Sequence, residues 1–453
     1  MRIYFCGQPK FSDIITKSIA MKFSESLEYL LNLGNEVVAM KLGLENIRKV
    51  LDALGNPEKN YLKVQIAGTN GKGSTCAFLE AICVSAGINV GLTTSPHLIS
   101  ITERIKINGQ EISEKDFARH ATKIREMSEK LVAEGKLETV PTFFEQVTAI
   151  ALNAFAEAKI DLAILETGLG GRFDATTAAK AEIVALTPID FDHQNILGNS
   201  LAEIAAEKAA IIREDTRVLS VPQKTEAEKI IYGKCREVRV QPIWTIPDVK
   251  IIEDLGGGLL YLNFKTKMTN YKPDFWMRGR HQWTNATLAI YIAETLRDFG
   301  FKIEQENIEI GLEIARHRGR LEFYKNFLFD GAHNVGGAKA LREFLDEFIH
   351  RPITLVFGAM KDKDLTEIAE IILPKADKLI FTKPDNPRSM ETSELMKFVP
   401  TTFENKEVFM TETVEEAIEK ARKVSSEKHL ILVTGSLYLV GEAQKLLNNE
   451  SEI

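Results

Sequence analysis

The chain has 453 residues, of which 44% are hydrophobic and 27% charged, and its formal net charge is −7. This composition is typical of a globular protein with more than one core, and it excludes a disordered or fibrous chain. The charges are spread without long runs, so we expect no nucleic-acid partner. The four cysteines form no Cys-x-x-Cys pair, and no apolar run suggests a signal core or a membrane span. We therefore expect a cytoplasmic protein without membrane contact.

The N-terminal region is predicted to hold an extension and two helices. Residues 1–22 show no pattern that joins them to the next helix, so we assign them to an N-terminal extension. Apolar residues at helical spacing predict helices at 24–33 and 44–54, and a glycine closes each of them.

Residues 61–86 predict a strand, a phosphate loop and a helix. Val64 and Ile66 indicate a short buried strand, and apolar residues recur at helical spacing after the loop. Such a turn points backbone N–H groups at an anion on the helix N-terminus, and Lys72 adds a positive charge for the outer phosphates. The predicted nucleotide-binding residues are Gly68, Thr69, Asn70, Gly71, Lys72, Gly73 and Ser74.

This loop departs from the common phosphate-loop pattern at two positions. Ile66 stands where the leading glycine is usual, and Gly73 stands where a Ser or Thr usually holds Mg²⁺. A nucleotide-bound Mg²⁺ must therefore find its protein oxygen elsewhere, or at Ser74. The alternative, an ordinary Gly-rich turn, is disfavoured because Gly-Lys flanked by two further glycines is unusual at such a turn.

Strands and helices alternate after the loop. Predicted helices lie at 114–134 and 141–158, and predicted strands at 89–93, 99–107, 161–165 and 183–187. The last two strands are continuous apolar runs of the kind buried in a parallel sheet. This alternation predicts a doubly wound, mostly parallel α/β sheet.

Residues 215–265 are predicted to be mainly strands, at 218–221 and 238–244 and in an antiparallel hairpin of 249–252 with 259–264. A helix at 283–299 and a shorter one ending near 315 follow. Strands return at 321–324, 326–330, 353–357, 378–381 and 430–434. We therefore expect a nucleotide-binding α/β domain at 23–314 and a smaller Rossmann-like α/β domain at 315–453.

Three polar side chains follow predicted parallel strands, where ligands bind in open α/β sheets: Ser95, Glu166 and His193. A hydroxyl, a carboxylate and an imidazole beside a triphosphate make a credible Mg²⁺ set, completed by waters and phosphates. Ser95 as a plain turn residue and His193 as a hydrogen-bonded loop residue remain open alternatives.

Two further regions carry polar side chains. Lys208 lies in a helical stretch and, taken alone, is typical of a charge on a solvated helix. The sequence Asp-Gly-Ala-His-Asn at 330–334 ends an apolar strand and opens a helix, with Arg318 and Arg320 just upstream. It predicts a second half-site that faces the first, and ordinary surface loops are the alternative.

Over residues 23–441 the chain resembles the folylpolyglutamate synthases, a Mur-ligase-type family that in many bacteria doubles as dihydrofolate synthase. Gly73 favours this folate branch, because Mur ligases proper more often have Ser or Thr after the loop lysine. The motifs that carry the resemblance are Gly-Thr-Asn-Gly-Lys-Gly-Ser at 68–74, Thr-Ser-Pro-His at 94–97, Thr-Phe-Phe-Glu at 142–145, Glu-Thr-Gly-Leu-Gly-Gly-Arg-Phe-Asp-Ala-Thr at 166–176, Asp-His-Gln at 192–194 and Asp-Gly-Ala-His-Asn at 330–334.

The resemblance makes the domain at 23–314 an ATP-binding Mur-ligase-like domain, and it implies roles for individual residues. Mg²⁺ would be held by Ser95, Glu166 and His193, with Lys208 carbamylated to serve near a second metal. It also implies catalytic roles for Lys72, Lys208 and His333. Further contacts would come from Asn285, Arg320 and Asp330 to ATP, and from Phe144 and Asp174 to the pterin part of a folate or dihydropteroate.

The implied reaction is the ATP-dependent addition of L-glutamate to a folate through an acyl phosphate, by a protein expected to be a monomer. One alternative is a Mur-type ligase acting on a UDP-linked cell-wall precursor, against which we count the lack of a preceding UDP-binding domain. Another is a nucleotide-binding regulator without turnover, against which we count the intact set of Ser95, Glu166, His193 and Lys208.

Overall fold

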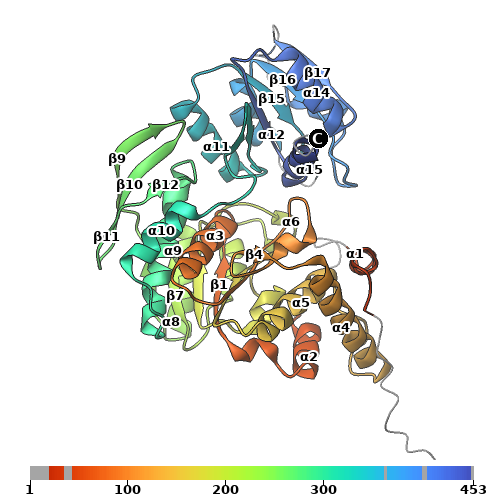
Figure 1. Cartoon of the computed structure of the whole chain (residues 1–453), viewed down its shortest axis with the longest axis vertical. Coiled ribbons are helices and arrows are strands. Elements are labelled where there is room, and N and C mark those ends of the chain that lie inside the picture. Colours follow the sequence, from red (N-terminus) through yellow and green to blue (C-terminus); the bar gives the residue numbers. More distant parts are fainter. Residues whose placement is uncertain (1–19, 35–42, 362–364, 400–402, 404–405, 450–453) are drawn as a thin grey trace, which may run out of the picture.

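The computed structural model describes residues 20–34, 43–361, 365–399, 403 and 406–449, so most of the predicted N-terminal extension lies outside the described residues. The chain forms a larger and a smaller lobe (Figure 1). The break between them follows helix α10 (Gln305–Ile314), and the domain boundary at 314/315 stays a prediction. In the part of the chain that is described, no helix is long and apolar enough to cross a membrane.

An eight-stranded sheet forms the centre of the larger lobe, in the order β4-β3-β2-β5-β1-β6-β7-β8. Strands from β2 to β8 in this order are parallel, and β3 and β4 add an antiparallel edge. The mostly parallel sheet of the prediction is confirmed. The strands are β1 (Leu62–Ala67), β2 (Val90–Thr93), β3 (Ile105–Ile107), β4 (Gln110–Glu111), β5 (Leu162–Glu166), β6 (Ile183–Leu186), β7 (Arg217–Ser220) and β8 (Pro242–Trp244).

Helices cover both faces of this sheet. One core joins α3, α9 and α10 to one face, a second joins α2, α4 and α5 to the other, and a third packs α7 and α8 against β6 and β7. The sheet is therefore buried on both sides, which explains its continuous apolar strands. Besides α10, the helices of this lobe are α1 (Phe23–Asn32), α2 (Glu45–Ala53), α3 (Lys72–Ser85), α4 (Glu114–Ala133), α5 (Phe143–Glu157), α6 (Gln194–Leu197), α7 (Leu201–Ala209), α8 (Thr225–Glu237) and α9 (His281–Asp298).

A small antiparallel sheet lies at one edge of the larger lobe, as the hairpin predicts (Figure 1). Its apolar face belongs to the same core as α3 and α9. The strands are β9 (Val249–Gly256), β10 (Leu259–Lys265), β11 (Asn270–Tyr271) and β12 (Asp274–Phe275).

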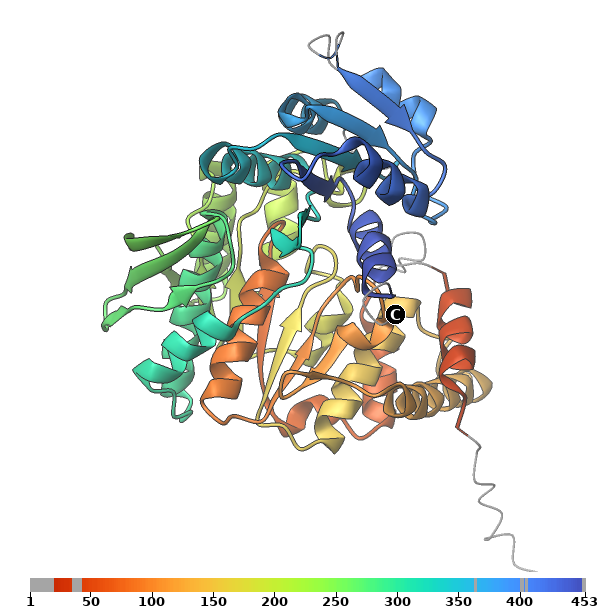
Figure 2. The same ribbon diagram turned by 45° about the horizontal axis from the view of Figure 1, so that its top comes forward.

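The smaller lobe has a six-stranded sheet in the order β13-β14-β18-β15-β16-β17, parallel from β14 onward. Helices α11 and α12 cover one face, and α14 and α15 the other. Figure 2 shows α15 descending beside the larger lobe. The elements are β13 (Glu322–Tyr324), β14 (Phe327–Phe329), α11 (Val335–Phe348), β15 (Ile353–Phe357), α12 (Leu365–Ile372), β16 (Lys378–Phe381), α13 (Thr392–Leu395), β17 (Glu407–Met410), α14 (Val414–Val424), β18 (Leu430–Thr434) and α15 (Leu437–Asn449).

The structure corrects two predicted strands. Only 105–107 of the strand at 99–107 is extended, because Ser100 and Glu103 form a capping box that starts a 3₁₀-helix, Ile101–Arg104. Of the strand at 238–244 only β8 is extended. Helix α8 precedes it within the stretch expected to be strands, and this crossover makes β7 and β8 parallel.

The contact between α3 and α10 depends on Gly311. A Cβ at this position would lie 2.5 Å from the Cα of Ile82 and 2.6 Å from its backbone N, so the two helix backbones almost touch. We predict that Gly311→Ala destabilises the fold by about 1–3 kcal/mol through overpacking, seen as a lower midpoint of thermal unfolding. Gly233→Ala is the matched control, because nothing lies within 4 Å of its added Cβ in α8 and alanine favours helix. Equal effects of the two substitutions would contradict the close approach.

Candidate active site

A cavity of about 460 Å³ lies between the lobes, beside the loops that follow β1, β5 and β6. The structure brings all of the site residues predicted from the sequence to its wall, although their individual roles stay predictions. These residues are Gly68, Thr69, Asn70, Gly71, Lys72, Gly73, Ser74, Ser95, Phe144, Glu166, Asp174, His193, Lys208, Asn285, Arg320, Asp330 and His333.

The phosphate loop runs from the end of β1 into α3. Gly71 has φ +86° and caps the helix, a conformation that L side chains rarely adopt. A side chain at this position would also collide with the amide of Asn285 on α9. Lys72 Nζ folds back and donates to the carbonyls of Gly68 and Thr69, at 3.1 Å each. The loop is thus held in shape before any anion binds.

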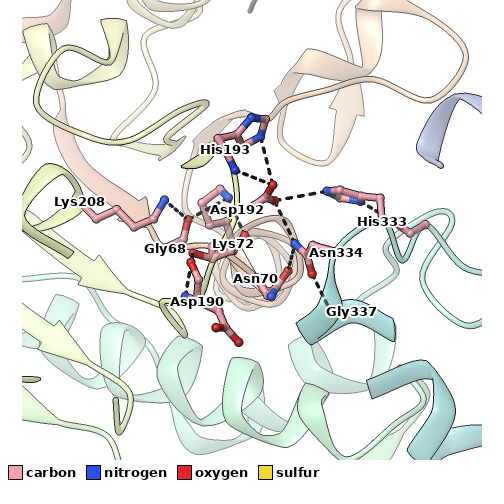
Figure 3. A network of polar contacts seen from close by, with 12 residues as sticks. Gly68, Asn70, Lys72, Asp190, Asp192, His193, Lys208, His333, Asn334 and Gly337 are labelled. Carbon is pink, nitrogen blue, oxygen red and sulfur yellow. Dashed lines mark hydrogen bonds and ion pairs between the residues drawn. The ribbon is translucent and has the colours of Figure 1, made fainter. Parts of the chain in front are cut away.

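Lys208 reaches the same loop from α7. Its Nζ donates to the Gly68 carbonyl at 3.0 Å, so two ammonium groups meet at one oxygen (Figure 3). Burial, together with the charge of Lys72, lowers the pKa of Lys208 to about 7, against the opposing effect of Asp192 and Asp174. A sizeable fraction of the amine is therefore neutral near neutral pH, and the neutral amine is the form that can react with CO₂.

Glu166 and Ser95 lie at the ends of neighbouring strands, and Ser95 N donates to Glu166 Oε2 at 3.0 Å. Burial raises the pKa of Glu166, while Lys72 and Arg320 act in the opposite direction. Among the described residues, no three His, Cys, Asp or Glu side chains converge as a metal cluster. Mg²⁺ keeps several waters and phosphate oxygens, so a carboxylate, a hydroxyl and an imidazole would supply only part of its shell, and their role as ligands stays a prediction.

The folate residues of the prediction shape one wall of the cavity. The Phe144 ring lies on Gly168, where a Cβ would be 2.6 Å from its Cζ. Asp174 accepts from the backbone N–H groups of Gly168 and Leu169, at 2.9 Å each, and of Thr176 at 3.0 Å. Asp174 therefore has a structural task in this loop, whatever it contacts in a ligand.

Polar contacts cross from the smaller lobe to the phosphate loop (Figure 3). Asn334 Nδ2 donates to Asn70 Oδ1 at 2.9 Å and to Asp192 Oδ2 at 3.0 Å, while its Oδ1 caps α11 by accepting from Gly337 N. Asp192 also accepts from His193 N at 2.9 Å and lies 3.9 Å from His333 Nε2. The sequence pattern marked Asn334 only as the end of a motif, since its contacts depend on how the lobes meet.

Asp330 and Arg320 form the part of the site next to the lobe junction. Asp330 accepts from Leu321 N and Ala332 N at 3.0 Å each. Burial raises its pKa, and Arg320 opposes that effect. His333 Nδ1–H donates to the Gly331 carbonyl at 2.7 Å, so its Nε2 points toward Asp192.

A phosphate loop on a parallel sheet, with a second α/β lobe closing over it, defines a nucleotide-dependent enzyme of the Mur ligase type. Accordingly, the family model of the Mur ligase middle domain matches residues 66–293, and that of the Mur ligase glutamate ligase domain matches residues 319–437.

Individual relatives narrow the class. The dihydrofolate synthase/folylpolyglutamate synthase of Bacillus subtilis is 35% identical over 91% of this chain and 97% of its own length. Mycobacterium tuberculosis folylpolyglutamate synthase complexed with ADP has TM-score 0.86 and 28% identity, covering 94% of this chain and 98% of that one. The bifunctional enzyme of Yersinia pestis, complexed with AMPPNP and Mn ion, has TM-score 0.79 and 27% identity, with coverage of 94% and 98%. The chain belongs to the folylpolyglutamate synthase/dihydrofolate synthase family of ATP-dependent ligases.

We predict that Asn334→Asp loosens the contact between the lobes. The substitution keeps the helix cap but replaces the amide donor by a carboxylate beside Asp192. Amide hydrogen exchange at 68–71 and 335–338 should become faster by about an order of magnitude, as expected for the loss of a hydrogen bond to a charged group. The exposed Asn60→Asp should leave this exchange unchanged. Unchanged exchange in Asn334→Asp would show that the contact does not depend on this amide.

Proposed function

We propose that this chain adds L-glutamate to a folate at the expense of ATP, through an acyl phosphate. The observation that carries the proposal is that one cavity is lined by the phosphate loop, by acidic and imidazole side chains and by residues of the smaller lobe. The family and the nucleotide complexes of its relatives support ATP and a divalent cation as the partners of this cavity.

The nucleotide phosphates would bind at the N-terminus of α3. The first turn of α3, Lys72 to Ser74, lines the cavity, and Lys72 can exchange its carbonyl partners for phosphate oxygens. When bound, Mg²⁺ neutralises phosphate charge, and the residues that would hold it are Ser95, Glu166, His193 and carbamylated Lys208. The fixed donors and charges then favour transfer of the γ-phosphoryl group to the folate carboxylate.

The amino acid would enter from the side of the smaller lobe. Arg388, Ser436 and His333 line that end of the cavity. A guanidinium, a hydroxyl and an imidazole suit the carboxylates of glutamate, whose amine attacks the acyl phosphate and releases phosphate. The wall formed by Phe144 and the 168–174 loop would take the pterin.

Three buried cysteines, Cys76, Cys83 and Cys235, are free thiols and support a reducing, cytoplasmic location. We also propose that the protein acts as a monomer.

The first test is an ATP-dependent ligation assay with radiolabelled glutamate. We expect product with a tetrahydrofolate or dihydropteroate acceptor, and comparing the two shows which glutamate is added. A UDP-linked muramoyl acceptor tests the Mur-type alternative. A rate of ATP hydrolysis that does not depend on glutamate or on folate would contradict the proposal.

Lys72→Ala should reduce product formation in this assay by at least about two to three orders of magnitude, since the loop would lose its charge for phosphoryl transfer. The exposed Lys59→Ala is the control and should retain full activity. An active Lys72→Ala variant would refute this placement of the phosphates.

Lys208→Ala should impair ligation on the order of a hundredfold, because a carboxylate-like ligand beside the loop is lost. Short carboxylic acids should restore part of the activity by taking the place of the carbamate. Lys229→Ala, on the exposed face of α8, should behave like the unaltered protein. Full activity of Lys208→Ala would remove this residue from the site.

A further inference from the structure

His317 lies in the segment that joins the lobes, between α10 and β13. Its Nδ1 is hydrogen-bonded to Ser74 Oγ at 3.1 Å, on the first turn of α3. The ring also covers Gly73: a Cβ at that glycine would lie 2.6 Å from His317 Cε1 and 2.9 Å from its Nε2. The imidazole therefore occupies the space into which a side chain at position 73 would point.

This arrangement gives a physical reason for one of the two departures from the phosphate-loop pattern, the glycine at position 73. A Ser or Thr at 73 cannot coexist with the His317 ring in its observed position. The hydroxyl of Ser74, the other oxygen that could have served Mg²⁺, is engaged by the same ring. Glu166 Oε1 lies 3.4 Å from the position of that Cβ, so the ring and this carboxylate border the same part of the cavity.

The segment 315–321 is fixed at its other end to the smaller lobe. Gly331 N donates to the Gly319 carbonyl at 2.9 Å, and Leu321 N donates to Asp330 Oδ2 at 3.0 Å. Arg320, between these two contacts, lines the cavity. The segment thus connects the first turn of the phosphate-loop helix with the turn that carries Asp330.

We propose that His317 is a positioning residue for the nucleotide, which fixes Ser74 and the first turn of α3 and thereby sets Arg320 against the phosphates. The inference rests on the proposed nucleotide site and adds a residue to it. Burial and the nearby Arg320 lower the pKa of His317 to about 3, so the ring is neutral and can accept one hydrogen bond while donating another.

The first experiment measures binding of MgADP to the full chain by calorimetry, without any turnover. We expect His317→Leu to weaken binding by about three- to tenfold, the effect of losing one neutral hydrogen bond. His317→Asn, which keeps a polar atom near the place of Nδ1, should recover most of the affinity. His350→Leu, an exposed histidine of the smaller lobe, should leave it unchanged. Unaltered affinity in His317→Leu would overturn the proposal.

A second experiment uses the predicted collision. Gly73→Ala should weaken MgADP binding in the unaltered background, because the added Cβ displaces the ring. In a His317→Ala background the same substitution should cause no further loss. An equal effect of Gly73→Ala in both backgrounds, or no effect in either, would overturn the proposal even if His317→Leu fails to fold.

The outcomes separate this inference from the proposed function. If the unaltered chain binds MgADP and His317→Leu binds it with the same affinity, the positioning role of His317 is refuted while the proposed function is not. If the chain binds MgADP with the expected sensitivity but shows no glutamate ligation, the function fails and the positioning role remains. Absence of MgADP binding in the unaltered chain would refute both.

Discussion

Two lysine ammonium groups share the carbonyl oxygen of Gly68, and the rest of the site depends on this crowding of positive charge. Burial, and after it the charge of Lys72, raises the free energy of the protonated form of Lys208 and so lowers its pKa. Negative charge at the loop lowers this electrostatic free energy. Bound phosphates would supply such a charge, and so would conversion of one lysine amine to a carbamate. A protein with a net charge of −7 thus keeps a local site for polyanions.

The smaller lobe completes the site rather than merely covering it. Asn334 joins Asn70 of the phosphate loop to Asp192, and Asp192 lies between the imidazoles of His193 and His333. Residues from both lobes therefore contact the same side-chain oxygens, those of Asn70 and Asp192. If a ligand at the phosphate loop changes the lobe junction through these contacts, a ligand bound in the smaller lobe must affect the loop by the same free energy.

The sequence was sufficient to predict the mostly parallel sheet and the residues at its carboxyl edge, because strand order does not change which end of a parallel strand carries the ligand. The predicted strand was wrong at 101–104. The capping box of Ser100 and Glu103 stabilises a 3₁₀-helix there, although the alternation of apolar residues is typical of a strand. Helix α8 was not predicted because most of its residues are polar. Its buried face consists only of Ala227, Ile231 and Cys235, which is a weak helical signal in the sequence. The contacts of Asn334 and His317 could not be predicted, since they arise only when the lobes are placed against each other.

The near contact of the α3 and α10 backbones at Gly311 has a mechanical consequence. It makes the helix that carries the phosphate loop and the helix that leads out of the larger lobe a single rigid unit. On the other side, β13 is paired with β14. Any change in the angle between the lobes must therefore be absorbed by the backbone torsions of 315–321. The segment that must bend when the lobes move therefore also holds His317 and Arg320, which line the cavity proposed to bind the nucleotide.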